Sequence, residues 1–250
     1  MNEKTVYAVG IGPGAEDLLS PRAKEILLRC DVIVGYDKYL DQFSELLKGK
    51  ILIPGKMRQE KDRCTSALDA SLEGKSVAVI SSGDAGIYAM AGLLMELSEI
   101  DKYKDINIEV IPGITAASAA SAVLGAPLMN DFAIISLSDL MTPQSVILKR
   151  IIGVANAGLV CVLYNPSSKK RNKLIHEVIC IFKNAYDIDI WCGIVRHASR
   201  EKECKSVCKI SEFPFDKIDM STVVVLGNDK TVYKNGQLYT LRGYGDKNVQ

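Results

Sequence analysis

Short apolar runs alternate with helical periodicity through the first half of the chain. The runs are rich in β-branched residues, and each is followed by apolar positions at the spacing of an amphipathic helix. Strands that alternate with helices indicate a parallel sheet, here in a first α/β domain of about 110 residues. The predicted strands are 6–9, 32–34, 51–53, 76–80 and 108–111, and the predicted helices are 21–29, 41–47, 56–73 and one that starts at Ile87.

The segment 81–88 is the most informative break in this pattern. The run 76–80 is almost wholly apolar, as expected of a strand buried on both faces, and two glycines and Asp84 then interrupt it before Ile87 resumes helical spacing. Ligands of open α/β sheets bind outside the carboxyl ends of the strands, and glycines let backbone N–H groups approach a ligand closely. The turn predicts a binding site, with Asp84 as a helix N-cap as the plain structural alternative.

The first strand leads into 10–15, which matches the dinucleotide fingerprint G-x-G-x-x-A. Two features argue against a nicotinamide dinucleotide at this loop. Pro13 has no N–H to offer a pyrophosphate, and Ser20 and Pro21 begin a helix well after the last glycine. A pyrophosphate would then miss the helix N-terminus on which this motif depends. We expect the loop to approach a ligand other than NAD.

The second half repeats the α/β theme less regularly and predicts a mixed sheet. It opens at 112–122, where a glycine precedes a run of small residues that favours close approach to a ligand or, equally, tight packing. Asn235 and Gly236 predict the turn of a β-hairpin over 232–239. The other predicted elements are strands 133–136, 160–164 and 222–226, a strand within 188–195, and a helix from Thr142 to about Asn156.

Composition narrows the classes of function. The 250 residues are 48% hydrophobic and carry 31 basic and 30 acidic side chains, so nothing favours nucleic acid or an anionic membrane as a partner. No apolar run has the length of a membrane span, and we expect no signal peptide. Seven scattered cysteines do not form a disulfide framework, which favours a reducing cytoplasm. The basic run 169–171 is expected to be a solvated helix start that an anionic ligand could also contact.

Few side chains offer strong acid–base or metal chemistry. His197 follows a predicted strand, whereas His176 lies inside a helical pattern and is expected to be structural. Cys192, Cys204 and Cys208 lack the spacing of paired zinc ligands, so we predict no metal site. The sequence contains neither a nucleophile elbow nor a P-loop. Strand ends with small and polar residues suit the alignment of reactants, as in methyl transfer from a sulfonium donor.

Six segments of the chain resemble the tetrapyrrole (precorrin) methylase family. Three of them match the signatures of the whole family in order and spacing, and three later ones are similar to one branch. That branch contains the ring-contracting C17-methyltransferases of cobalamin biosynthesis, which act on precorrin-3B or cobalt-factor III. The likeness covers essentially the whole chain. The family segments are 9–14, 82–88 and 112–117, and the branch segments are 136–143, 163–166 and 193–196.

The resemblance implies two α/β domains, 1–114 and 115–250, with a parallel sheet in the first, a mixed sheet in the second and the active-site cleft between them. It also implies S-adenosylmethionine as methyl donor, a tetrapyrrole substrate that could carry cobalt, and a homodimer. Two departures from many family members, Ala85 and Asn165, would leave main-chain contacts intact. By position, the cofactor-binding residues would be Pro13, Ser82, Gly83, Asp84, Ile87, Thr115, Ala116, Asn165 and Ala198.

The activity that the resemblance implies is C17 methylation coupled to ring contraction. Expelling a meso carbon from the ring requires proton transfer at an oxygen substituent. His197 is the first candidate, because histidine exchanges protons near neutral pH, and Asp139 is the second. Arg58 suits the substrate's carboxylates, because a guanidinium fork matches carboxylate geometry. The alternatives are a sibling methylase acting at another ring carbon, an NAD-dependent oxidoreductase and a tetrapyrrole carrier without catalysis.

Overall fold

The structure is a computed structural model that describes residues 4–167 and 172–244. The chain divides into two compact units, Met1–Ala116 and Ala117–Gln250, whose boundary falls two residues beyond the expected one at 114. The predicted helix start at 169–171 lies outside the described residues. None of the helices in the described ranges is long and apolar enough to cross a membrane.

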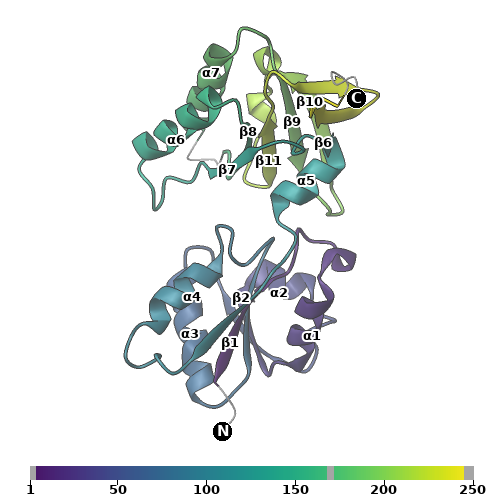
Figure 1. The fold of residues 1–250 in the computed structure, drawn as a ribbon. Helices are drawn as coiled ribbons and strands as arrows, with labels where there is room; N and C mark the ends of the chain where they lie inside the picture. The colour runs from purple at the N-terminus through teal and green to yellow at the C-terminus, as the bar shows by residue number, and fades with distance from the viewer. Residues whose placement is uncertain (1–3, 168–171, 245–250) are drawn as a thin grey trace. The chain divides into compact units, whose positions relative to one another are not determined.

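The first unit is built on a five-stranded sheet in the order β3-β2-β4-β1-β5 (Figure 1). All neighbouring strands are parallel, which confirms the prediction from alternating strands and helices. Because β1 lies between β4 and β5, the carboxyl ends of these three strands are neighbours. The strands are β1 Thr5–Gly10, β2 Val32–Tyr36, β3 Ile51–Gly55, β4 Val77–Ser81 and β5 Asn107–Ile111, and the helices are α1 Pro21–Arg29, α2 Asp37–Gln42, α3 Glu60–Leu72 and α4 Met90–Ser98.

The central strand β4 is buried on both faces, and its alternating side chains enter two separate cores. Val77 and Val79 pack with α3 and α4 on one face of the sheet. Ala78 and Ile80 pack with α1 and α2 on the other face. The two helix layers are visible on opposite sides of the sheet in Figure 1. Burial on both faces explains why this strand has almost no polar residue before its last position.

The helix with clear capping residues in the sequence starts where it was predicted, whereas two others start later. α1 begins as predicted, because Pro21 takes its first position and the hydroxyl of Ser20 accepts a hydrogen bond from the N–H of Ala23 at 3.2 Å. A short 3-10 helix, Glu16–Leu18, separates α1 from the first glycine loop. α3 begins at Glu60 instead of 56, and α4 begins at Met90 instead of Ile87. The turn after β4 is therefore longer than its sequence pattern indicated.

The second unit contains a five-stranded sheet that is mixed, as predicted, and its strand order is β10-β9-β11-β8-β7. β7 and β8 are parallel, and β11 is antiparallel to both β8 and β9. β7, β8 and β9 therefore run the same way and end at the same edge. The outer strand β10 has no apolar pattern that predicts it, because none of its residues is buried. The strands are β7 Phe132–Ser136, β8 Val160–Tyr164, β9 Trp191–Arg196, β10 Cys204–Lys209 and β11 Thr222–Leu226.

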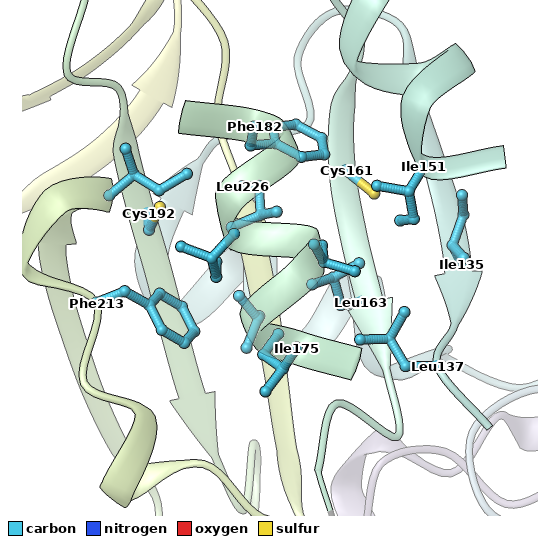
Figure 2. Packing of buried hydrophobic residues seen from close by; sticks show 14 of the residues in the cluster. Ile135, Leu137, Ile151, Cys161, Leu163, Ile175, Phe182, Cys192, Phe213 and Leu226 are labelled. Carbon is cyan, nitrogen blue, oxygen red and sulfur yellow. The ribbon is translucent and has the colours of Figure 1, made fainter. Parts of the chain in front are cut away.

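Helices α6 (Gln144–Asn156) and α7 (Lys173–Ala185) cover one face of this sheet. Figure 2 shows the core beneath α7, where Phe182 and Ile175 lie against side chains of the strands, among them Leu163 and Leu226. Two 3-10 helices, Ile210–Glu212 and Phe215–Lys217, complete this part of the unit. The ring of His176 stacks on that of Phe215 at 3.9 Å between centroids. This contact gives His176 a structural role.

A small sheet and helix α5 (Ala116–Leu124) pack beside the large sheet of the second unit. A Cβ on Gly193 would come within 2.5 Å of Leu124 and 2.8 Å of Leu238, so this glycine lets both leucines lie directly on β9. Asn235 and Gly236 both have positive φ, 51° and 75°, which confirms the predicted hairpin turn. The strands of the small sheet are β6 Gly125–Ala126, β12 Thr231–Lys234 and β13 Gln237–Thr240.

Candidate functional site

Three loops meet at the carboxyl edge of the first sheet, after β1, β4 and β5. The N–H of Gly12 donates to the carbonyl of Gly83 at 3.1 Å, and the N–H of Gly83 donates to the carbonyl of Gly12 at 2.7 Å. This pair forms an isolated antiparallel bridge between the first two loops. The N–H of Ile11 also donates to the carbonyl of Ser81 at 2.9 Å. Main-chain hydrogen bonds therefore fix the loops that follow β1 and β4 to each other.

Glycine is required in these loops because the backbones touch. A Cβ on Gly113 would lie 2.2 Å from the carbonyl oxygen of Gly83, and a Cβ on Gly10 would lie 2.7 Å from the same oxygen. The expectation that these glycines expose backbone N–H groups to a ligand is wrong for Gly12 and Gly83, whose N–H and carbonyl groups bond each other. Gly10 and Gly113 are the glycines that let the three loops pack without side chains between them.

Asp84 ties the second loop to the third. Its Oδ1 accepts a hydrogen bond from the N–H of Gly86 at 2.8 Å, and its Oδ2 accepts one from the N–H of Gly113 at 3.0 Å. The alternative role of Asp84 as a helix N-cap is wrong, because α4 begins at Met90 after Ala89. Hydrogen bonds from backbone donors to a carboxylate are among the stronger ones in proteins. Asp84 is therefore a brace for the glycine loops.

Gly83 is buried against the backbone of Thr115 and Ala116. Gly83 has φ +70°, and a Cβ there would meet nothing closer than the backbone of Thr115 and Ala116 at 3.7 Å. These three predicted cofactor residues therefore lie side by side. Pro13 is buried, and Ser82, Asp84 and Ile87 are partly exposed. An edge made of main chain and small side chains fits a cofactor that is held by shape and backbone contacts.

In the second unit, side chains rather than glycines hold the strand ends. Asn165 follows β8 in a left-handed conformation, φ 52°, and its side-chain amide donates to the hydroxyl of Ser136 at 2.9 Å. The same hydroxyl accepts the N–H of Ser138 at 3.2 Å. The phenol oxygen of Tyr164 accepts the N–H of Ala117 at 2.6 Å, in the first turn of α5. No pattern in the sequence indicates this role of Tyr164.

His197 follows β9 at the same edge, also in a left-handed conformation, φ 55°. Its N–H donates to the carbonyl of Ser221 at 3.0 Å, and its carbonyl accepts the N–H of Arg200 at 2.9 Å. Arg196 beside it forms an ion pair with Asp219 at 2.6 Å. Among the described residues, 4–167 and 172–244, none forms a hydrogen bond with the imidazole of His197.

The other predicted site residues occupy separate places. Asp139 lies in the loop after β7 and accepts a hydrogen bond from Gln144 at 3.0 Å. β7 and β9 share an edge but are separated by β8 and β11, so Asp139 and His197 do not come from neighbouring strands. Ala198 is buried at 9% exposure. Arg58 belongs to the first unit, after β3, with φ 71° and an exposed side chain.

Two of the cysteines that were considered for a metal site have raised thiol pKa values. Cys208 on β10 lies opposite Cys192 on β9. Burial raises the pKa of the Cys208 thiol to about 11 and that of Cys192 well above its ordinary value, so both stay protonated at neutral pH. In the described part of the chain, no three His, Cys, Asp or Glu side chains are placed to hold a metal ion.

Comparisons with known proteins agree with this architecture. The family described as Tetrapyrrole (Corrin/Porphyrin) Methylases matches residues 5–214. A Methanocaldococcus jannaschii protein named probable cobalt-factor III C(17)-methyltransferase is 42% identical over 97% of this chain and 98% of its own. The cobalamin biosynthesis protein CbiHC of Archaeoglobus fulgidus is 41% identical over 97% of this chain, which spans about half (53%) of that relative.

Among solved structures, the crystal structure of the methyltransferase CobJ has a TM-score of 0.90 to this chain. The two proteins are 35% identical, and the match covers 95% of this chain and 99% of that one. Sequence and structure therefore point the same way over nearly the full length. The chain belongs to the tetrapyrrole (corrin/porphyrin) methylase family.

Proposed function

We propose that this chain transfers a methyl group from S-adenosylmethionine to C17 of a cobalamin precursor and couples the transfer to ring contraction. The observation that carries this proposal is the end-to-end match to the Methanocaldococcus jannaschii relative, which is named a probable cobalt-factor III C(17)-methyltransferase. The substrate would be cobalt-factor III, as in that name, with metal-free precorrin-3B as the alternative. Cobalt would belong to the substrate and not to the protein.

The glycine loops of the first unit supply the cofactor site in this proposal. S-adenosylmethionine would bind against Gly83, Thr115 and Ala116, which lie side by side, and Pro13, Ser82, Asp84 and Ile87 are the other proposed contacts in this unit. Asn165 and Ala198 of the second unit are the remaining proposed contacts. S-adenosylmethionine supplies a methyl group that is already activated as a sulfonium. The protein then needs to orient donor and acceptor, and rigid loops braced by Asp84 suit that task.

Ring contraction adds proton transfer, and the second unit provides the side chains for it. We assign the proton-transferring role to His197, whose backbone is fixed on both sides by hydrogen bonds while its ring is unrestrained by the described residues. Asp139, at the same sheet edge, is the second choice. Arg58 and Lys56 of the first unit would bind substrate carboxylates.

Mass spectrometry of the product tests the proposal directly. The protein is incubated with methyl-labelled S-adenosylmethionine and either cobalt-factor III or precorrin-3B. A contracted product with the label at C17 supports the proposal, and the substrate that is converted decides whether cobalt is needed. Label at another ring carbon would identify a sibling methylase instead. Substrate binding without methyl transfer would identify a carrier, and hydride transfer from NADH would identify an oxidoreductase.

The proposed enzyme is a homodimer, as the family resemblance implies. Light scattering of the purified chain should give about twice its 27.3 kDa mass at working concentration. A 27.3 kDa particle would exclude the dimer and leave the proposed chemistry unchanged.

A further inference from the structure

Arg63 is the only charged residue counted as buried in the described ranges, with 8% of its surface exposed. It lies in the first part of α3. A buried guanidinium loses hydration that its partners must replace, and apolar substitutes for buried ionic groups often leave stability unchanged or higher. Fold stability is therefore a poor reason for an arginine at this position.

One arm of Arg63 holds the start of the loop that follows β3. Its Nη1 donates to the carbonyl of Lys56 at 2.6 Å. Its aliphatic stem lies flat on Gly55, where a Cβ would come within 2.6 Å of Cγ. The side-chain oxygen of Gln59 accepts the N–H of Lys56 at 2.8 Å, which closes the loop from the other side. The backbone of Lys56 is thereby fixed at two atoms.

The other arm of Arg63 supports the backbone of Arg58 through Glu60. Nη2 lies 3.5 Å from Oε1 of Glu60, and the same oxygen accepts the N–H of Arg58 at 3.2 Å. Arg58 has φ 71°, a left-handed conformation that an arginine adopts only when its surroundings impose it. The outcome is a loop in which Lys56, Met57 and Arg58 all have exposed side chains.

Arg63 also joins this loop to the helix that follows the glycine loops. Its Nη2 lies 3.8 Å from the sulfur of Met90, the first residue of α4. The loop and the Asp84 turn both follow carboxyl ends of strands in one parallel sheet, so they share an edge. The guanidinium of Arg63 thus lies between the loop 56–58 and the helix that follows the proposed cofactor-binding turn.

We propose that Arg63 is a positioning residue for substrate recognition: it holds Lys56 and Arg58 where they bind carboxylate side chains of the tetrapyrrole. Two cations on either side of an exposed Met57 (64%) match a ligand with an apolar ring and an anionic rim. Arg63 itself does not touch the substrate. The inference rests on the proposed function and adds a residue that orients its substrate-binding side chains.

The primary test compares Arg63→Met with Lys61→Met. Both variants remove one positive charge from the start of α3, but Lys61 is exposed and outside the network. Arg63→Met should raise the KM for cobalt-factor III about tenfold, with kcat and the Kd for S-adenosylhomocysteine within about twofold of wild type. Lys61→Met should change none of the three by more than about twofold. An unchanged KM in folded Arg63→Met would overturn the inference.

Glu60→Ala gives a second test, in which the direction of the change in KM distinguishes a positioning role from a purely electrostatic one. If Glu60 acted only through its charge, its removal would strengthen binding of an anionic substrate and lower the KM. The positioning role predicts the opposite, a higher KM, because Arg58 and Arg63 lose their shared acceptor. The Glu60 side chain is half-exposed, so this variant carries the test if Arg63→Met does not fold. A lowered KM would overturn the inference.

A triple variant completes the experiment. If Arg63 acts only through Lys56 and Arg58, adding Arg63→Met to the Lys56→Met/Arg58→Met variant should change the KM by no more than about twofold, because the effects are not additive. Multiplicative effects would overturn the inference. Absence of turnover in the wild-type protein would instead reject the proposed function, so the two failures are distinguishable.

Discussion

The two sheets of this protein fix their carboxyl edges in different ways. In the first unit, backbone lies directly on backbone, with Gly10, Gly83 and Gly113 in contact. In the second unit, Asn165 and His197 take left-handed turns, and side-chain or main-chain hydrogen bonds hold them. Closely packed glycine loops present a rigid backbone surface to a ligand. Polar side chains at strand ends instead supply proton donors and acceptors. In the proposed function, the first unit positions the cofactor and the second unit supplies the groups for proton transfer.

The substitution with the largest expected effect disrupts the backbone contacts among Gly10, Gly83 and Gly113. Gly113→Ala would place a methyl group 2.2 Å from the carbonyl oxygen of Gly83, so one loop must move away. We expect a loss of at least about 3 kcal/mol in the free energy of unfolding. Gly92→Ala is the matched control, because a Cβ on this exposed glycine of α4 meets nothing within 4 Å. It should raise stability by about 0.5–1 kcal/mol. Urea unfolding of both variants measures the difference.

His197→Ala tests whether the imidazole at the end of β9 transfers protons during ring contraction. The substitution removes the imidazole but not the backbone hydrogen bonds to Ser221 and Arg200. Binding of S-adenosylmethionine should stay normal, while ring contraction slows by about 10²–10⁴-fold, the usual range for an acid–base group. Product analysis over time separates methylation from contraction. Contraction at the wild-type rate would show that His197 is structural.

Gly83→Ala and Gly74→Ala separate site effects from backbone strain. Both glycines have positive φ, +70° and +84°, and each substitution should cost roughly 1–2 kcal/mol of stability. A Cβ on Gly83 would occupy the space assigned to the cofactor beside Thr115, whereas one on Gly74 would meet open solvent at the end of α3. Calorimetry should show binding of S-adenosylhomocysteine at least about tenfold weaker in Gly83→Ala only. Equal affinities in the two variants would show that the cofactor does not bind beside Gly83.

Asn165 shows how much a side chain contributes at the polar edge. Asn165→Gly keeps the left-handed turn but loses the hydrogen bond to Ser136, which should cost about 1 kcal/mol. Asn165→Ala adds backbone strain and should cost about 2 kcal/mol. Chemical unfolding measures both. Equal losses in the two variants would mean that the left-handed conformation is not the constraint.

The smallest expected effect concerns an aspartate–serine contact that occurs once in each unit. Asp31 accepts hydrogen bonds from the hydroxyl and N–H of Ser76, and Asp189 accepts them from those of Ser211. The hydroxyl in each pair lowers the pKa of the carboxyl below its ordinary value. The stability that each pair contributes is therefore present above about pH 4 and is lost as the pH falls through the lowered pKa.

Ser76→Ala and Ser211→Ala test this pair of contacts. Each variant should be slightly less stable than wild type at pH 7, and the difference should vanish towards pH 2. Thermal unfolding across this range checks it, with the two variants expected to behave alike. A difference that grows on acidification would contradict the assigned sign.

The sequence predicted what local patterns control. The parallel first sheet, the start of α1 at Ser20 and the Asn235–Gly236 hairpin follow from burial, capping and turn chemistry, and all three are confirmed. Sequence patterns could not predict contacts between segments that lie far apart in the chain. The spacing of glycines revealed close approach near Gly83 but not that another loop, rather than a ligand, bonds its backbone.

The errors have the same physical origin. β10 is an exposed edge strand without alternation, so no periodicity marks it. No pattern in the sequence distinguishes Arg63, and only the structure shows it buried beneath the loop of Lys56. Non-local packing decides both cases, and one sequence carries no direct record of it.

A crystal structure of the protein with S-adenosylhomocysteine tests the central assignment most directly. The account predicts density for the ligand against the loops at 10–14, 82–88 and 113–116, within van der Waals contact of Gly83, with the Asp84 hydrogen bonds to Gly86 and Gly113 intact. Density at the opposite edge of that sheet, or at a distance from all three loops, would contradict it.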